Sequence, residues 1–442
     1  MADLRRLPKV DVLAASPLLE RFPAAVRTSA ARSAIEAMRS ALREGAVVDL
    51  SHAESAALEV AQAISSPSLK PVVNATGIVL HTGAGRARLA PAAIEAIARV
   101  AASHSSVEVD LEDGRRGDRQ THVRSLLCEL TGAEDALVVN NCAAAVFLAL
   151  NTLCTGGEVI LSRGQMIEIG GTFRMPDIVR QSGCRLVEVG CTNKTRLSDY
   201  QEACGPETKA LLRCHPSNFK VVGFAQEVPI GELAGLTRSK GLLLIDDMGS
   251  GCLVDTSEYG LPRQTRVQDC IADGADVVLA SGDKMLGGPQ AGLILGRRDL
   301  VARMKQHPLA RALRVDKLTL AALEATLRLY RDGMESTIPT LAYLAKPLAT
   351  IKRDAQRLAR AFPGAVVEAG WSEIGGGSLP GESLPTWRAG LPAEDLDALA
   401  NRLRQSDPPI LSRIENGRVW LDPRTMDASE VRTVAKILAG LS

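Results

Sequence analysis

The sequence predicts an α/β fold with a mostly parallel sheet in a large central domain, a helical N-terminal domain and a small C-terminal α+β domain. Short apolar runs alternate with helical stretches through the middle of the chain, which is typical of βαβ units. A helical stripe precedes these units, and an alternating pattern around Asn416-Gly417 follows them. The length of 442 residues exceeds what one hydrophobic core usually supports, so we expect two or three domains.

Residues 1–65 are predicted to form the helical N-terminal domain. Apolar residues at intervals of four place one face of a helix against a core, and the pattern ends at Gly45. The stripe consists of Val26, Ala30, Ala34, Met38 and Leu42. Pro67 and Pro71 then indicate a linker to the next domain.

Residues 66–330 are predicted to form the large domain. Short runs rich in apolar and β-branched residues, regularly separated by helical stretches, indicate strands of a mostly parallel sheet that is covered on both faces. The runs lie in EDALVVNN, GEVILSRG, CRLVEVG, KALLRC, GLLLIDDMGSG, ADVVLASGDK and AGLILG. A long helical pattern over 315–332 ends this domain.

Residues 331–442 are predicted to form the small C-terminal α+β domain. The pattern over 340–362 indicates one helix, and a final helix is expected from about Ala428. Between them, PILSRIENGRVWLD alternates in polarity around Asn416-Gly417, which favours a hairpin.

The overall charge gives no reason to expect nucleic acid binding, because 52 basic residues balance 51 acidic ones and leave a net charge of +1. Residues 1–43 differ, since eight Lys and Arg stand against four Asp and Glu, a local charge of +4. On charge alone, this segment is either a solvated helical face or a local site for nucleic acid.

The nine cysteines are scattered, and no two have the two-residue separation that zinc sites and redox motifs need, so no metal is expected. Their scatter favours reduced thiols in a cytoplasmic enzyme. The N-terminus lacks an apolar stretch long enough for a signal peptide, and nowhere do about 18 apolar residues follow one another, so we expect no membrane partner.

Polar residues follow three of the predicted strands at the point where each strand ends. Asn141 and Cys142 open a helix of small residues, whose free N–H groups can hold a phosphate. Asp246 and Asp247 follow a second run, and Lys284 follows a third. Because ligands of open α/β sheets bind beyond the carboxyl ends of the strands, we expect these groups to converge.

Pyridoxal phosphate requires a lysine for its Schiff base, a carboxylate that keeps the ring nitrogen protonated, and a site for its phosphate. Lys284 and Asp247 suit the first two roles, and Ser281 adds a hydroxyl for the phosphate. Alternatively, Lys284 is a surface lysine paired with Asp283, and Asp246 and Asp247 cap a helix. The order and strand context of the three groups favour pyridoxal phosphate.

Longer motifs carry a family resemblance from LPKVDVL at residue 7 to NGRVWLD near the C-terminus. They are VVNATGIVLHTGAGRA, TGAEDALVVNNCAAAVFLAL, VILSRGQMIEIGGTFRMPDI, DDMGSGCLVD, SGDKMLGGPQAGLILG, IGGGSLP and HPLARALRVDKLTLAALEATLRLY. Together they resemble bacterial selenocysteine synthase, the L-seryl-tRNA(Sec) selenium transferase family. The resemblance implies a fold-type I pyridoxal phosphate-dependent transferase that converts seryl-tRNA(Sec) to selenocysteinyl-tRNA(Sec) with selenophosphate.

By this resemblance Lys284 forms the Schiff base and Asp247 faces the pyridine nitrogen. Arg86, Arg311 and Arg314 match arginines on the anion-binding side of the site, where selenophosphate would bind. Arg311 and Arg314 are three apart, so on a helix they would point the same way. The family's basic N-terminal domain binds tRNA and the family assembles as a ring of dimers, so a homo-oligomer is expected.

In the implied reaction the Lys284 amine removes the Cα proton of the seryl group, water leaves from Cβ, and selenium adds to aminoacrylyl-tRNA. Loss of water needs a general acid, for which Asp283 and His215 are candidates. His215, Asn141 and Cys142 are also assigned to the cofactor pocket.

The chain departs from the family pattern near the expected pocket. The positions are Gly83, Ala84, Arg88, Cys142, which stands where a third Asn is common, and Gln165. They leave open a related pyridoxal phosphate lyase that acts on a small phosphorylated amino acid or amino sugar. A third alternative is a tRNA-binding protein that has lost catalysis.

Overall fold

The computed structural model describes residues 6–171 and 173–441, and contacts divide the chain into two compact units, Met1–Pro71 and Val72–Ser442. Asp3 and Arg5, which count toward the local charge of the N-terminal segment, lie outside the described residues. Within those residues, no helix is long and apolar enough to cross a membrane.

The first unit is helical and has a core rich in alanine. Its helices are α1 (Val10–Ala14), α2 (Ala24–Arg43) and α3 (Ala53–Ser65). Ala30 and Ala34 of α2 pack with Ala57 and Ala61 of α3, all almost fully buried, because small side chains let helix backbones approach closely. The predicted stripe is confirmed for Val26, Ala30, Ala34 and Met38, whereas Leu42 does not belong to this core. The backbone turns left-handed at Gly45, just after α2.

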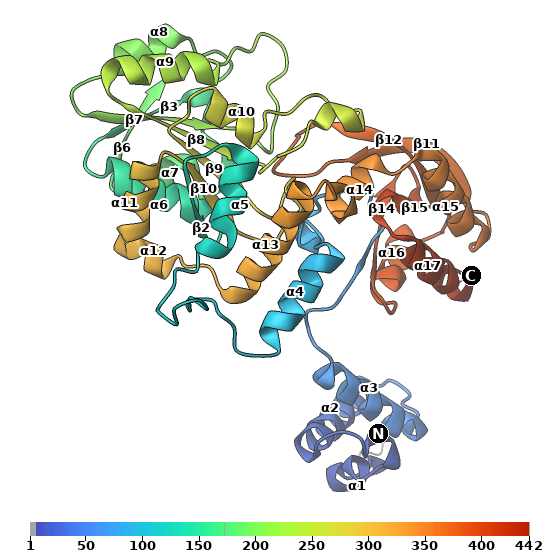
Figure 1. Cartoon of the computed structure of the whole chain (residues 1–442). Helices are drawn as coiled ribbons and strands as arrows, with labels where there is room; N and C mark the ends of the chain where they lie inside the picture. Colours follow the sequence, from blue (N-terminus) through green and yellow to red (C-terminus); the bar gives the residue numbers. More distant parts are fainter. Residues whose placement is uncertain (1–5, 172, 442) are drawn as a thin grey trace. The chain divides into compact units, whose positions relative to one another are not determined.

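The second unit contains a seven-stranded sheet in the order β2-β10-β9-β8-β7-β3-β6 (Figure 1). The strands are β2 (Asp135–Val139), β3 (Glu158–Ser162), β6 (Arg185–Val189), β7 (Thr208–Cys214), β8 (Leu243–Gly249), β9 (Val277–Ser281) and β10 (Gly292–Gly296). Neighbours from β9 to β6 are parallel, which confirms the predicted mostly parallel sheet. Strand β10 runs antiparallel to β2 and β9, because residues 282–291 are too few for a parallel crossover.

Helices cover both faces of this sheet. One face carries α6 (Cys142–Cys154), α7 (Met175–Gln181) and α11 (Arg298–Gln306), and the other carries α5 (Thr121–Thr131), α9 (Ile230–Lys240), α10 (Val267–Ala272) and α13 (Lys317–Arg331). Side chains alternate between the two layers, so that Val139 packs with α6 whereas Val138 packs with α5. This part of the unit also contains α4 (Pro91–Ala101), which packs on α13, and the short helices α8 (Leu197–Ala203) and α12 (Pro308–Ala312).

The C-terminal part of this unit is α+β, as predicted. Its antiparallel sheet has the order β11 (Val366–Glu373), β12 (Ser383–Leu391), β15 (Arg418–Leu421) and β14 (Arg413–Glu415). It packs with α15 (Leu348–Arg360), α16 (Leu396–Arg404) and α17 (Ala428–Leu441). The predicted hairpin is confirmed, because Asn416 and Gly417 both have positive φ, at 48° and 71°.

The single helix predicted over 340–362 is wrong. The chain forms α14 (Pro339–Ala345) and then α15, with a break at Lys346-Pro347. Proline lacks an N–H and disfavours helical backbone at the preceding residue, so it ends one helix and begins the next.

Two short pairings complete the unit. Strand β1 (Val73–Asn74) pairs with β13 (Ile410–Leu411), and β4 (Glu168–Ile169) pairs with β5 (Phe173–Arg174) as a two-stranded ribbon.

Candidate active site

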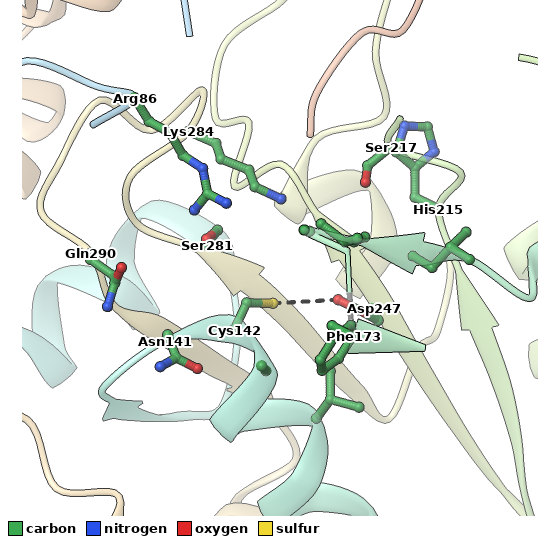
Figure 2. Close-up of a pocket in the computed structure, with 16 residues that line it drawn as sticks. Arg86, Asn141, Cys142, Phe173, His215, Ser217, Asp247, Ser281, Lys284 and Gln290 are labelled. Atoms are coloured by element: carbon green, nitrogen blue, oxygen red, sulfur yellow. Dashed lines mark hydrogen bonds between the residues drawn. The ribbon is translucent and has the colours of Figure 1, made fainter. Parts of the chain in front are cut away.

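A cavity of about 300 Å³ lies at the edge of the large sheet where β2, β7, β8 and β9 end. Seven residues named from the sequence line it: Arg86, Asn141, Cys142, His215, Asp247, Ser281 and Lys284 (Figure 2). The predicted convergence of strand ends is therefore confirmed, and the cavity has the size of a small-molecule site.

The turn after β9 holds Lys284 inside the protein. The Gly282 N–H donates to Ala291 O at 2.9 Å, and the Gly287 N–H donates to Lys284 O at 2.9 Å. The lysine is only 5% exposed, and its amine has no hydrogen bond or ion pair with the described residues. The alternative of a surface lysine is therefore wrong, and the Gly-Gly-Pro turn serves to bury a free amine.

A glycine of the loop between β11 and β12 lies against this amine. A Cβ on Gly377 would lie 2.7 Å from Lys284 Cε and 2.8 Å from Nζ, and the backbone has φ +94°. The Gly377 N–H donates to Ser217 O at 3.0 Å, which fixes the loop at the cavity wall. Both the space and the backbone conformation therefore require glycine at this position.

Asp247 lies on β8 with its carboxylate in the cavity. It is 7% exposed, and a register shift between Asp247 and Gly249 interrupts the pairing with β9 at this point. Burial raises the pKa of Asp247 to about 6, while Lys284 and the Cys142 thiol lower it and Asp246 raises it further. Because both acids belong to β8, the alternative that they cap a helix is wrong.

Asp246 points away from the cavity and forms an ion pair with Arg213. The Arg213 Nη1–Asp246 Oδ1 distance is 2.8 Å, and the Asp246 side chain is fully buried. The charge of Arg213 thus balances the negative charge of the buried Asp246, the neighbour of Asp247 on β8.

The N-terminus of α6 opens onto the cavity. The Asn141 side chain caps the helix by accepting the Ala144 N–H at 2.9 Å. The N–H groups of Cys142 and Ala143 have no partner in the described chain, because the first turn of a helix offers none. These two groups are suited to an anion such as a phosphate.

Arg86 and Asp283 form an ion pair at the cavity rim. The Arg86 Nη1–Asp283 Oδ2 distance is 2.9 Å, and Ser281 Oγ donates to Asp283 Oδ1 at 2.9 Å. Asp283 is thus the partner of Arg86 and not of Lys284. Arg86 has φ 62°, an unusual conformation for a residue other than glycine.

His215 follows β7 and contacts the backbone of Asp247. Its backbone N–H donates to Asp247 O at 3.0 Å, and the ring atom Nε2 lies 3.3 Å from Ser378 O. Burial lowers the pKa of His215, so the ring is mostly neutral near pH 7.

Arg311 and Arg314 do not share a helix, so the expectation that they point the same way as helix neighbours is wrong. Helix α12 ends at Ala312, and Arg314 forms a β-bridge with Val139. The chain leaves the helix because Leu313 O accepts the Asn140 N–H at 3.0 Å. The cavity lining formed by this single chain does not include either arginine.

Most of the departures from the family pattern lie away from the cavity. Arg88 is exposed and pairs with Glu430 at 3.1 Å, and Gln165 is buried where its Oε1 accepts the Cys214 N–H at 3.2 Å. Gly83 and Ala84 form a short 3₁₀ turn. Within the described chain, Cys142 is the one departure that lines the cavity, so most of the expected changes near the pocket are not in it.

Sequence reasoning missed several lining residues. Ser217 and Gln290 lie close to predicted strand ends. The rule that ligands bind beyond the carboxyl ends of strands could therefore have identified them. Phe173 and Ile169 reach the cavity from the β4–β5 ribbon, and no local pattern predicts that placement.

The donor set fits pyridoxal phosphate. The cavity offers the free amine of Lys284 for an aldehyde, the buried carboxylate of Asp247 for a ring nitrogen and two free N–H groups for a phosphate. The Ser217 side chain adds a 2% exposed hydroxyl with no partner in the described chain. A doubly covered, mostly parallel sheet with this site at its carboxyl edge defines the class of fold-type I pyridoxal phosphate enzymes.

Comparison with known proteins narrows this class. The profile described as "L-seryl-tRNA selenium transferase" matches residues 72–427. The chain is 47% identical to the L-seryl-tRNA(Sec) selenium transferase of Moorella thermoacetica, over 98% of this chain and 96% of that protein. It is 45% identical to the protein of that name from Rhizobium meliloti, over 98% and 97%. The chain belongs to the L-seryl-tRNA selenium transferase family.

A solved structure is similar in fold. The structure of D-glucosaminate-6-phosphate ammonia-lyase superposes with a TM-score of 0.61 at 23% identity, over 84% of this chain and 96% of that one. At this identity the likeness supports the fold and carries no information on substrate.

Proposed function

We propose that this protein converts L-seryl-tRNA(Sec) to L-selenocysteinyl-tRNA(Sec) with selenophosphate. The observation that carries the proposal is 45–47% identity, over 98% of the chain, to proteins named for this activity. The alternative of a lyase acting on a small phosphorylated amino acid or amino sugar has only the fold in its favour.

Different cavity residues are proposed to hold different parts of the cofactor. Pyridoxal phosphate, when bound, supplies an electron sink for the carbon next to the substrate amine. In the proposal Lys284 holds the aldehyde and Asp247 the ring nitrogen. The N–H groups of Cys142 and Ala143, with the Ser281 hydroxyl and Asn141, hold the phosphate. The backbone N–H of His215 holds the backbone of Asp247, and the His215 side chain is proposed to contact the cofactor from the cavity wall.

Lys284 acts as the base in the proposal. Once its amine is free, Nζ takes the proton from Cα of the seryl group, and the buried setting excludes water from this transfer. The hydroxyl group on Cβ then leaves with a proton as water. Asp283 and His215 are the proposed sources of that proton. Selenium of selenophosphate then bonds to Cβ, and Lys284 returns its proton to Cα. The selenium–phosphorus bond breaks by reaction with water, so the phosphoryl group leaves as phosphate.

Arg86 is the proposed ligand of the selenophosphate anion, because a planar guanidinium binds a phosphate-like oxyanion with two hydrogen bonds. Arg311 and Arg314 are assigned to the same anion, and a second copy of the chain would have to bring them to the cavity. Exposed apolar side chains support the proposed homo-oligomer, since Val222 and Phe224 are each 86% exposed.

The first unit is the proposed tRNA-binding element, because its basic residues are suited to a phosphate backbone. The described cysteines are all free, which supports a reducing, cytoplasmic location.

Purified protein incubated with cofactor, seryl-tRNA(Sec) and selenophosphate tests the proposal. We expect selenocysteinyl-tRNA(Sec), and we expect the Lys284→Ala variant to make none. Product no greater than that of the variant would reject the proposed reaction. Turnover of a phosphorylated amino sugar by a chain that lacks residues 1–71 would favour the lyase instead.

A further inference from the structure

We propose that the Cys142 thiol is a positioning residue for Asp247, which it keeps ionised and oriented for the ring nitrogen of bound pyridoxal phosphate. This inference rests on the proposed use of the cofactor, but not on the identity of the amino acid substrate. The side-chain thiol of Cys142 thereby has a role distinct from that of its backbone N–H, which is proposed to bind the phosphate.

The contact is direct and partly buried. Cys142 Sγ lies 3.4 Å from Asp247 Oδ1, and Figure 2 shows the thiol and carboxylate facing each other across the cavity floor. In the described chain no other side chain donates a hydrogen bond to this carboxylate. The Asn141 cap fixes the start of α6 and hence the direction of the thiol.

The thiol is held in the form that can donate. Burial raises the pKa of Cys142 well above its ordinary value, and the negative charges of Asp247 and Asp283 raise it further, against the opposing effect of Lys284. A protonated thiol is a hydrogen-bond donor and a poor nucleophile. Cys142 is therefore suited to support the carboxylate and not to attack an electrophile in the cavity.

Opposing effects on the charge of Asp247 make its ionisation sensitive to the hydrogen bond from Cys142. Lys284 and the thiol favour the ionised carboxylate, whereas burial and Asp246 oppose it, and Arg213 pairs with Asp246. Cys214, also buried, is a neutral neighbour because burial raises its pKa. The pKa of Asp247 is about 6 with the thiol hydrogen bond in place. If loss of this bond raised that pKa by about one unit, much of the carboxyl group would be protonated near neutral pH.

The same proton governs the cofactor. An ionised Asp247 keeps the proton on the ring nitrogen, where it makes the ring a strong electron acceptor. If the carboxylate loses its donor it becomes more basic and competes for that proton. The thiol thus acts on the ring nitrogen through Asp247 without touching it.

Four variants of Cys142 separate the hydrogen bond from packing. Cys142→Ala removes the donor, and Cys142→Val removes it while filling the space of the thiol. Cys142→Ser keeps a donor directly on Cβ, and Cys142→Asn supplies an amide N–H donor on a longer side chain.

The measurement is ¹⁵N NMR of the holoenzyme loaded with ring-labelled pyridoxal phosphate, across a pH series. We expect a protonated ring nitrogen at pH 7.5 in the unsubstituted protein and in the Ser and Asn variants. In the Ala and Val variants the ratio of protonated ring nitrogen to protonated Asp247 should fall about tenfold across the pH series, the effect of one hydrogen bond to a charged group. Their kcat should fall about tenfold with little change in KM.

Identical ring-nitrogen titrations in the unsubstituted, Ala and Val proteins would overturn the inference, as would Ser and Asn variants that behave like Ala. The expected fall in ring protonation in an enzyme that makes no selenocysteinyl-tRNA would support the role of Cys142 while rejecting the proposed substrate. If Cys142→Ala does not hold the cofactor, the Val and Ser variants still decide the question.

Discussion

Replacing Gly377 with alanine should disable Lys284 while leaving most of the fold intact. The new Cβ would lie 2.7 Å from Lys284 Cε, whereas carbon atoms in contact are about 3.5–4.0 Å apart. The end of a lysine is flexible, so it would move by about 1 Å at little energetic cost. A displacement of that size in a reacting group can lower the rate on the order of 100-fold. The left-handed backbone, with φ +94°, adds about 1–2 kcal/mol of destabilisation.

Gly381→Ala is the matched control, because Gly381 lies in the same loop with φ +74° and its Cβ would come no closer than 4.0 Å to Lys220 Cδ. Both variants should lose similar stability in thermal unfolding. Only Gly377→Ala should lose the visible absorbance of lysine-bound cofactor and the rate of product formation. Equal cofactor attachment in the two variants would show that a Cβ at position 377 does not displace Lys284.

Three further predictions concern Asp247, Arg86 and the N-terminal unit. Burial raises the pKa of Asp247 from 3.8 to about 6, so its contribution to stability is full below about pH 4 and lost as pH rises through 6. Without cofactor, Asp247→Asn should therefore be more stable at pH 8 by up to about 3 kcal/mol and no more stable at pH 3 in denaturant titrations. Arg86→Ala leaves Asp283 without its cation, so the free energy of unfolding should fall by about 1–2 kcal/mol. The KM for selenophosphate should rise at least about tenfold, with Arg86→Lys intermediate. An unchanged KM would show that Arg86 is not part of the anion site. A chain without residues 1–71 should keep the cofactor absorbance. In filter-binding assays at fixed salt it should bind tRNA on the order of 100-fold more weakly. Unchanged binding would place the tRNA site elsewhere in the chain.

Much of the large domain could be predicted from the sequence because its strands are buried runs of apolar residues. Polar groups at the ends of such runs meet at one edge, which is why Asp247 and Lys284 could be placed together before the fold was known. The same local signals failed at Lys346-Pro347, where an apolar period continued across a proline that ends the helix.

Contacts between distant segments could not be predicted from local patterns. Gly377 lies in the loop between β11 and β12, and it approaches Lys284 in the turn between β9 and β10, more than 90 residues earlier in the chain. The pairing of Asp283 with Arg86 and of Cys142 with Asp247 likewise depends on three-dimensional packing. Arg311 and Arg314 looked like helix neighbours because spacing alone does not show where a helix ends.

The proposed function depends on a bond between the amine of Lys284 and the aldehyde of pyridoxal phosphate. Borohydride reduction of the holoprotein, followed by peptide mapping, shows whether this bond forms. We expect the reduced cofactor on the peptide that contains Lys284. Label on another lysine, or no label at all in protein that holds the cofactor, would contradict the account.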